Sequence, residues 1–244
     1  MKTYYIGRFS IEVPAGMKIE RNSKVRHVKI EEIVWPKEVS HEQAYTNEWY
    51  KFLADIKKLG PPRGTDKVIL KMQDFSEMGA TAKGVFYHKD GDAADEATWS
   101  LLLDVGNIGV LFTGRSVLVE KENKSNLMLN NIENIFRSYH LPISKTYYPK
   151  ENYFYLQHGI IDLPYNWQEE SYAYFEGSPL ELVLTINMEM DSRHKIETLG
   201  LIEKTKGLLA AAALQTSGSI TKIRLNKREV AGMKGEESIL RITE

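Results

Sequence analysis

Serine, histidine and paired carboxylates are the residues from which a hydrolytic centre could be built, because hydrolysis needs an activated nucleophile and a base. The stretch Gly114–Leu118 (GRSVL) resembles the G-x-S-x-G nucleophile elbow but lacks its second glycine. His41–Tyr45 (HEQAY) begins like the zinc motif H-E-x-x-H and ends in tyrosine. The pairs Glu31-Glu32, Glu169-Glu170 and Glu236-Glu237 are adjacent, so on strands their members point to opposite faces. We therefore predict a protein that is not an enzyme.

The sequence gives equally little support for a metal or cofactor site. Asp90–Glu96 (DGDAADE) resembles a calcium loop only in composition, because its glycine is not at the sixth position and the twelfth residue is Leu101. Gly106–Gly109 leads from one predicted strand into another, so it offers no helix N-terminus to a phosphate. The chain has no cysteine, which excludes disulfides and thiolate chemistry. We expect no metal and no cofactor.

Aromatic residues gather in two places and suggest recognition instead of catalysis. Tyrosine is favoured at protein interfaces because it buries a large apolar area and keeps a polar tip. Packing between parts of the chain explains the same residues equally well, and both interpretations stay open here. The candidate interface residues lie in the passage 145–155 and in the predicted loop Ser171–Pro179: Tyr147, Tyr148, Tyr153, Tyr172, Tyr174 and Phe175.

The elements that would position these residues can be followed along the chain. An Ile11–Pro14 strand and a Val25–Trp35 strand precede a helix with Ser40 as N-cap, which ends at Gly60-Pro61-Pro62. Asp90-Gly91 and Gly106-Asn107 are favourable hairpin turns between later strands, and a helix follows at about Ser125–Tyr139. The four strands between the two helices are predicted at Lys67–Phe75, Ala80–His88, Ala97–Val105 and Ile108–Val117.

A second set of elements repeats part of this order. Ile11–Pro14 (IEVP) falls on Ile161–Pro164 (IDLP) with a shift of 150 positions. A strand at Leu180–Met190 follows, with apolar residues at alternate positions, and then a helix at about Ile196–Leu214. Strands at Lys222–Val230 and Gly235–Thr243 complete the set.

The repetition predicts two tandem α+β lobes, each an antiparallel sheet flanked by helices. The first lobe spans residues 1–142 in the order β-β-α-β-β-β-β-α, a linker spans 143–152, and the second lobe spans 153–244 as β-β-α-β-β. Because the second set stops before the last two strands and helix of the first, we expect its sheet to be completed by further chain or by another chain.

Charge and hydropathy restrict the partners. Thirty-two Lys and Arg against 33 Asp and Glu leave a net charge of −1, which gives no general attraction to nucleic acid or anionic membranes. The longest apolar run, Gly207–Leu214, is far shorter than the roughly 20 residues that span a bilayer, so we expect no stable membrane insertion. The opening MKTYYIGRF has no apolar core and is not a signal peptide. The oligomeric state is open.

Two motifs resemble one family. Thr3–Pro14 (TYYIGRFSIEVP) and Arg228–Glu237 (REVAGMKGEE) are similar to motifs of two-domain type VI secretion lipase immunity proteins. A cysteine that the family often carries near the first motif is absent, and family members continue beyond the position of Glu244. Phe9–Met17 (F-x-I-x-V-P-x-G-M) and Ile135–Tyr139 also resemble the Mog1/PsbP-like fold.

The resemblance implies a function that composition alone does not show. It implies an immunity protein that binds a cognate phospholipase effector and inhibits it by blocking the active-site entrance or holding a lid. It further implies a periplasmic location, with the cytoplasm as the alternative. A non-catalytic envelope accessory module of Mog1/PsbP type, binding a small ligand or another protein, is the alternative function.

Overall fold

The computed structural model forms two compact units, Met1–Met190 and Asp191–Glu244. The secondary structure is α+β, with antiparallel strand pairing throughout the described sheets. The structure describes residues 1–76, 81–89, 91–118, 123–142, 152–166, 168–177, 180–189, 200–212, 219–230 and 233–243.

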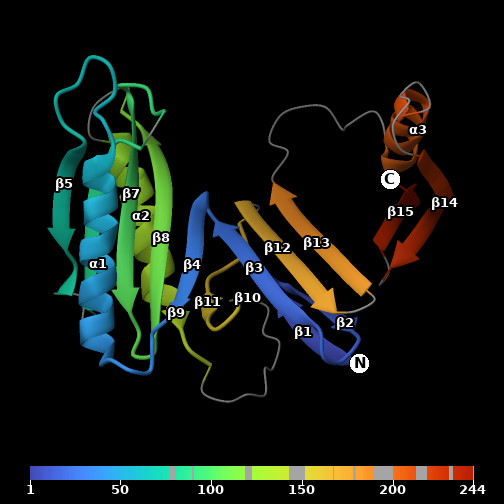
Figure 1. The fold of residues 1–244 in the computed structure, drawn as a ribbon, viewed down its shortest axis with the longest axis horizontal. Helices are drawn as coiled ribbons and strands as arrows, with labels where there is room; N and C mark the ends of the chain where they lie inside the picture. The colour runs from blue at the N-terminus through green and yellow to red at the C-terminus, as the bar shows by residue number, and fades with distance from the viewer. Residues whose placement is uncertain are drawn as a thin grey trace. The chain divides into compact units, whose positions relative to one another are not determined.

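An eight-stranded antiparallel sheet organises the first unit (Figure 1). Strands far apart in the sequence meet in it, because β12 pairs with β3 along eight residues. In spatial order the strands are β13 (Leu180–Glu189), β12 (Gln168–Gly177), β3 (Lys18–Val25), β4 (Val28–Val34), β8 (Ile108–Val117), β7 (Glu96–Asp104), β6 (Thr81–Tyr87) and β5 (Ile69–Asp74).

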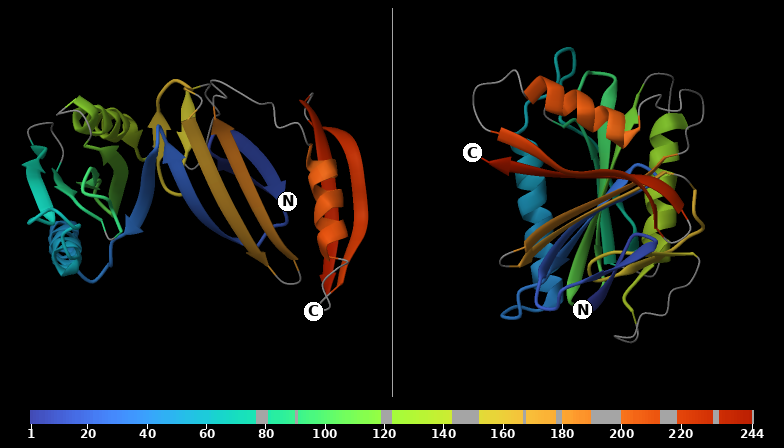
Figure 2. Two further views of the ribbon diagram at one scale, coloured as in Figure 1. Left: turned by 90° about the horizontal axis from the view of Figure 1, so that it is seen from above. Right: turned by 90° about the vertical axis from the view of Figure 1, so that its right-hand side faces the viewer.

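Two helices cover the β8–β7–β6 part of this sheet from opposite sides, as the view from above shows (Figure 2). Helix α1 (His41–Lys58) packs on a cluster that contains Leu102 of β7. Helix α2 (Asn123–Ser138) packs on the cluster that contains Leu101 and Leu103. Because neighbouring residues of a strand point to opposite faces, these three leucines place one helix on each face.

Helix α1 confirms the prediction made from its sequence. The Ser40 hydroxyl accepts a hydrogen bond from the backbone N–H of Gln43 at 3.3 Å, which caps the first turn. Tyr45, Trp49, Leu53 and Ile56 recur at helical spacing and are all buried. The helix ends before Gly60-Pro61, as expected.

The β12–β3 part of the sheet is covered on one face by an N-terminal hairpin. This hairpin consists of β1 (Lys2–Ile6) and β2 (Phe9–Val13), and its Tyr4, Ile6 and Val13 are buried with Ala173 and Phe175 of β12. A three-stranded sheet of β10 (Tyr153–Tyr155), β11 (Ile160–Asp162) and β9 (Tyr139–His140) joins it through a bridge between Gly7 and Tyr155.

The second unit is a helix on a two-stranded hairpin. Helix α3 (Leu201–Ala212) packs on β14 (Ser219–Val230) and β15 (Met233–Thr243). Glu236 accepts a hydrogen bond from the backbone N–H of Ile202 at 2.8 Å, and a carboxylate at that helix end is favourable. Arg228 forms an ion pair with Glu237 at 2.5 Å. Glu236 and Glu237 belong to the second family-like motif, Arg228–Glu237, and their contacts therefore connect elements of the second unit.

Seven strands were predicted close to their observed bounds. They are the four strands between α1 and α2 and the predicted strands Leu180–Met190, Lys222–Val230 and Gly235–Thr243. Two predictions were wrong. The Val25–Trp35 strand is interrupted by a turn at Arg26 and His27, whose φ angles are 51° and 63°. In the predicted loop Ser171–Pro179, residues 171–177 instead belong to β12, which is paired on both sides, while residues 178–179 lie outside the described part. The predicted helix at Ile196–Leu214 is observed at Leu201–Ala212; its outer residues lie outside the described part.

The tandem lobes are not shown by this arrangement. Strands β12 and β13 lie within the predicted second lobe, yet they extend the sheet built by the predicted first lobe. The two compact units divide at residue 190, while residues 143–151 of the predicted linker lie outside the described residues. The boundaries 1–142, 143–152 and 153–244 stay predictions.

Candidate protein-binding surface

Strand β12 presents one buried and one solvent-facing row of side chains. Glu169, Ser171, Ala173 and Phe175 are buried, while Glu170, Tyr172, Tyr174 and Glu176 alternate with them and are exposed or half-buried. Such alternation follows when one face of a strand is packed and the other faces water.

Strand β3 continues the solvent-facing row. Lys18, Glu20, Asn22 and Lys24 are exposed and stand opposite Glu176, Tyr174, Tyr172 and Glu170 of β12. These eight residues form a surface that we call the open face. Their exposure shows that no described element of the first unit packs over it.

The open face lies on the same side of the sheet as helix α1. Lys24 of β3 pairs with Lys29 of β4, and Ile33 lies four residues further along the same face of β4. Ile33 packs against the cluster formed with α1. Figure 1 shows α1 in front of the sheet between β5 and β7, with β3 and β12 uncovered further along the sheet, beyond β8 and β4.

Two of the five charged residues of the open face, Lys24 and Glu170, form an ion pair within the described residues. Their charged groups are 2.5 Å apart, and Lys18 stands opposite Glu176. Glu20 has no hydrogen bond or ion pair with any described residue. Two lysines and three glutamates give the open face a formal charge of −1.

The predicted interface residues are distributed over three places. Tyr172 (40% exposed) and the half-buried Tyr174 lie together on the open face. Tyr153 lies on β10, half-buried, with its ring 6.1 Å from that of Tyr155. Phe175 is fully buried, and its ring meets Tyr4 edge-on at 5.3 Å. Tyr147 and Tyr148 lie outside the described residues. A contact role for these residues stays a prediction; for Phe175 the structure shows packing.

A buried ion pair holds the other side of β12, and sequence reasoning missed it. The Arg8 guanidinium donates to both carboxylate oxygens of Glu169 at 2.6 and 2.7 Å, and to the carbonyl of Leu163 at 2.9 Å. The two side chains are 10% and 3% exposed. The guanidinium also lies 5.5 Å from the centre of the Tyr165 ring. Bidentate geometry of this kind fixes the orientation of both partners.

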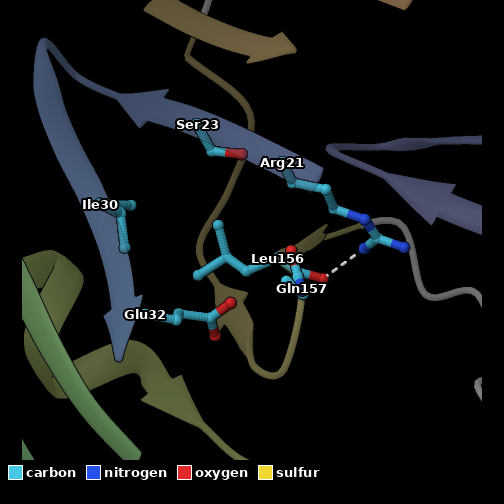
Figure 3. Close-up of a pocket in the computed structure, with 6 residues that line it drawn as sticks. All are labelled: Arg21, Ser23, Ile30, Glu32, Leu156 and Gln157. Carbon is cyan, nitrogen blue, oxygen red and sulfur yellow. Dashed lines mark hydrogen bonds between the residues drawn. The ribbon is translucent and has the colours of Figure 1, made fainter. Parts of the chain in front are cut away.

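A small, solvent-open pocket of about 70 Å³ lies between β3, β4 and the turn after β10 (Figure 3). Arg21 donates to the carbonyl of Leu156 at 2.5 Å. Glu32 accepts from the Tyr139 hydroxyl at 2.7 Å and from the backbone N–H of His158 at 2.9 Å. Both oxygens of Glu32 therefore hold the small sheet against β4, which is a structural role. The lining residues are Arg21, Ser23, Ile30, Glu32, Leu156 and Gln157.

A histidine–aspartate pair anchors the start of α1. Asp104 accepts from the Trp35 indole and the backbone of Gly106, both at 3.1 Å, and contacts His41 Nδ1 at 2.7 Å. The hydrogen bond to Asp104 raises the pKa of His41 above its usual value. The neighbouring Ser40 hydroxyl caps the helix, so the pair and the cap together orient the start of α1.

The described part of the chain has neither a metal-binding cluster nor a membrane-spanning helix. No group of three or more histidine, aspartate or glutamate side chains is placed to hold a metal ion. No described helix is both long and apolar enough to cross a membrane.

Comparison with known proteins gives similarity in structure only. No protein-family model matches the sequence. No curated protein matches it either. The immunity protein TplEi of the type VI secretion system of Pseudomonas aeruginosa aligns at a TM-score of 0.65 and 14% identity, over 99% of this chain and 76% of TplEi. TplEi in complex with a peptide termed "L" aligns at 0.63 and 14%, over 99% and 75%.

A chain of the Tle4–Tli4 complex aligns at a TM-score of 0.68 and 15% identity, over 98% of this chain and 74% of that chain. The resemblance predicted from the two motifs is thereby confirmed at the level of the fold. The chain shares the fold of type VI secretion immunity proteins over nearly its whole length.

Proposed function

We propose that the protein is an immunity protein, without catalytic activity of its own, that binds a phospholipase effector of a type VI secretion system and inhibits it. The observation that carries the proposal is the structural match over 98% of the chain to a chain of the Tle4–Tli4 complex. The two sequence motifs support it, because they resemble the same class of protein.

The open face supports binding to a protein surface. It is preorganised, because β12 is paired on both sides, β3 pairs with β12 along eight residues, and the Arg8–Glu169 pair lies behind them. A rigid surface loses little conformational entropy on binding, which favours affinity. Tyr172 and Tyr174 supply the aromatic anchors that protein interfaces favour.

The size of this surface limits how the complex is built. The open face spans seven positions of β12, about 24 Å, and two strands measure about 10 Å across, which gives roughly 240 Å². A stable interface buries about 800 Å² on each partner. The effector would therefore contact more of the protein than the open face, and it would be inhibited by occlusion of its active-site entrance or by restraint of a lid. We place this encounter in the periplasm, where secreted phospholipases reach membrane lipids.

Co-expression with the lipase encoded by the neighbouring gene tests the proposal. We expect a one-to-one complex in size-exclusion chromatography, and loss of phospholipid hydrolysis when this protein is added at equimolar concentration. An unrelated bacterial phospholipase serves as the specificity control and should keep its activity. Absence of a complex at micromolar concentrations of both proteins would overturn the proposal, because immunity requires tighter binding than this.

A further inference from the structure

We propose that the open face receives a basic side chain of the effector, an arginine or a lysine, between Glu20, Tyr172 and Tyr174. This inference rests on the proposed function and names the chemistry of the partner at one place on the surface. The occupant is a loop or helix of the effector that carries this cation.

The register between β3 and β12 builds the receiving site. Glu20 stands opposite Tyr174, and Asn22 stands opposite Tyr172, all on the open face. Directly opposed Cβ atoms in an antiparallel pair are about 5 Å apart, and diagonal neighbours are about 7 Å apart. The Glu20 carboxylate is therefore within reach of both phenol rings.

The residue that stands directly opposite distinguishes Glu20 from the other acids of the open face, although Glu176, like Glu20, makes no ion pair within the described residues. Glu170 is neutralised by Lys24 at 2.5 Å, and Glu176 has Lys18 directly opposite. Opposite Glu20 stands a tyrosine instead of a cation. Glu20 makes no hydrogen bond or ion pair within the described residues, and it is exposed.

The charge of Glu20 restricts which kind of partner surface can cover the open face. An apolar or acidic surface placed over Glu20 would remove water from an unpaired carboxylate, which is strongly unfavourable. A cation at the same place converts this cost into a charge-assisted hydrogen bond. Arginine fits best, because its planar guanidinium can bind a carboxylate and stack on a tyrosine ring at once.

A second copy of this chain is a weaker occupant. The same face on a second copy carries Glu20 and two lysines, of which Lys24 already has a partner and Lys18 stands opposite Glu176. Its formal charge of −1 is also of the same sign. Self-association through this face would therefore bring like charges together.

Binding of the purified effector to variants of the full chain tests the inference. The test variants are Glu20→Gln, Glu20→Arg and Tyr172→Ala, and the matched control is Glu12→Gln, an exposed glutamate on β2. We expect Glu20→Gln and Tyr172→Ala each to raise Kd about tenfold, and Glu20→Arg to raise it a hundredfold or more. Glu12→Gln should stay within about twofold of the wild type. Unfolding midpoints in urea should be unchanged for the Glu20 variants, which separates binding from folding.

Charge reversal on the effector provides the second arm. Each exposed arginine and lysine of the effector is changed to glutamate, and the residue that meets Glu20 should lose binding to the wild type and regain it with Glu20→Arg. If the Glu20→Arg variant binds the effector as tightly as the wild type does, this inference is overturned and the proposed function stands. Failure of the wild type to bind overturns the proposed function and this inference with it. Sedimentation velocity tests for a dimer that depends on protein concentration. If Glu20→Arg abolishes such a dimer and leaves effector binding intact, the open face binds a second copy of this chain, and the inference is overturned.

Discussion

Strands β7 and β12 belong to the same sheet and are buried in different ways. Seven consecutive residues of β7, from Ala97 to Leu103, are buried. In β12 burial alternates from residue to residue. The physical reason is coverage: α1 and α2 pack on opposite faces of β7, whereas β12 has the β1–β2 hairpin on one face and no described element of the first unit on the other.

This difference in burial indicates that two parts of one sheet have different roles. The covered part around β8, β7 and β6 contains most of the buried apolar side chains and should dominate stability. The open part around β12 and β3 offers a flat polar and aromatic surface on a rigid frame. Substitutions that compare the two parts test this division.

The largest effect is expected from Phe112→Ala in β8. Phe112 is fully buried, with its ring 6.3 Å from that of Tyr139. Truncation should lower the free energy of unfolding by about 3–5 kcal/mol through lost burial and a cavity. The comparison variant, Tyr172→Ala on the open face, should cost less than about 1 kcal/mol. Urea unfolding of both variants measures this difference, and equal costs would contradict the division.

A somewhat smaller loss is expected from Arg8→Ala. The change leaves the carboxylate of Glu169, 3% exposed, without its cation, at a cost of about 3 kcal/mol. Thermal and urea unfolding measure the loss. The double variant Arg8→Ala/Glu169→Ala should be more stable than the sum of the single losses predicts, because no unpaired charge is left. Strict additivity would show that the pair contributes nothing as a pair.

The His41–Asp104 pair makes the stability of the covered part depend on pH. The pKa of His41 is raised in the folded protein, first by its hydrogen bond to Asp104. A raised pKa means that the protonated form favours folding, so this contribution is present below about pH 6.5 and fades as pH rises through the folded-state pKa. The difference in melting temperature between the wild type and His41→Gln should shrink from about pH 5.5 to pH 8.5.

His27→Asn is the control for this pH dependence. His27 is exposed in the β3–β4 turn with φ of 63°, a conformation that asparagine tolerates. Its difference from the wild type should not follow the pH profile of His41→Gln. A pH-independent difference for His41→Gln would show that Asp104 does not favour the protonated ring.

The smallest effect is expected from Lys24→Ala on the open face. Lys24 and Glu170 form an ion pair in which the side chains are 49% and 42% exposed. Solvent screening limits exposed pairs to under about 1 kcal/mol, so the unfolding midpoint should barely move. A loss comparable to that of Arg8→Ala would show that the open face contributes to stability after all.

Local sequence patterns were sufficient to predict an element when its own residues show which side is buried and where it ends. Helix α1 was predicted from Ser40 and its apolar spacing, and β7 and β8 were predicted around the turn at Gly106-Asn107. Strand β3 (KIERNSKV) was missed because charged residues fill its exposed row. Strand β12 was interpreted as a loop because its buried row is recognisable only against the β1–β2 hairpin.

The candidate surface was predicted only in part for the same reason. Tyr172, Tyr174 and Phe175 were selected together by residue type, but the parity of β12 directs Phe175 to the opposite face. Glu20 was not selected at all, since its role depends on standing opposite Tyr174, 154 positions later in the chain. Arg8 and Glu169 are 161 positions apart, and no local signal connects them.

The sequence by itself determined the α+β class, most elements of the sheet, the lack of a recognisable catalytic motif and the resemblance to immunity proteins. Only the tertiary structure decided that β12 joins β3, which row of β12 is buried, and that Glu20 stands opposite a tyrosine. Alternation in a strand states which residues share a face, but burial of that face depends on what packs against it. That partner comes from a distant part of the chain.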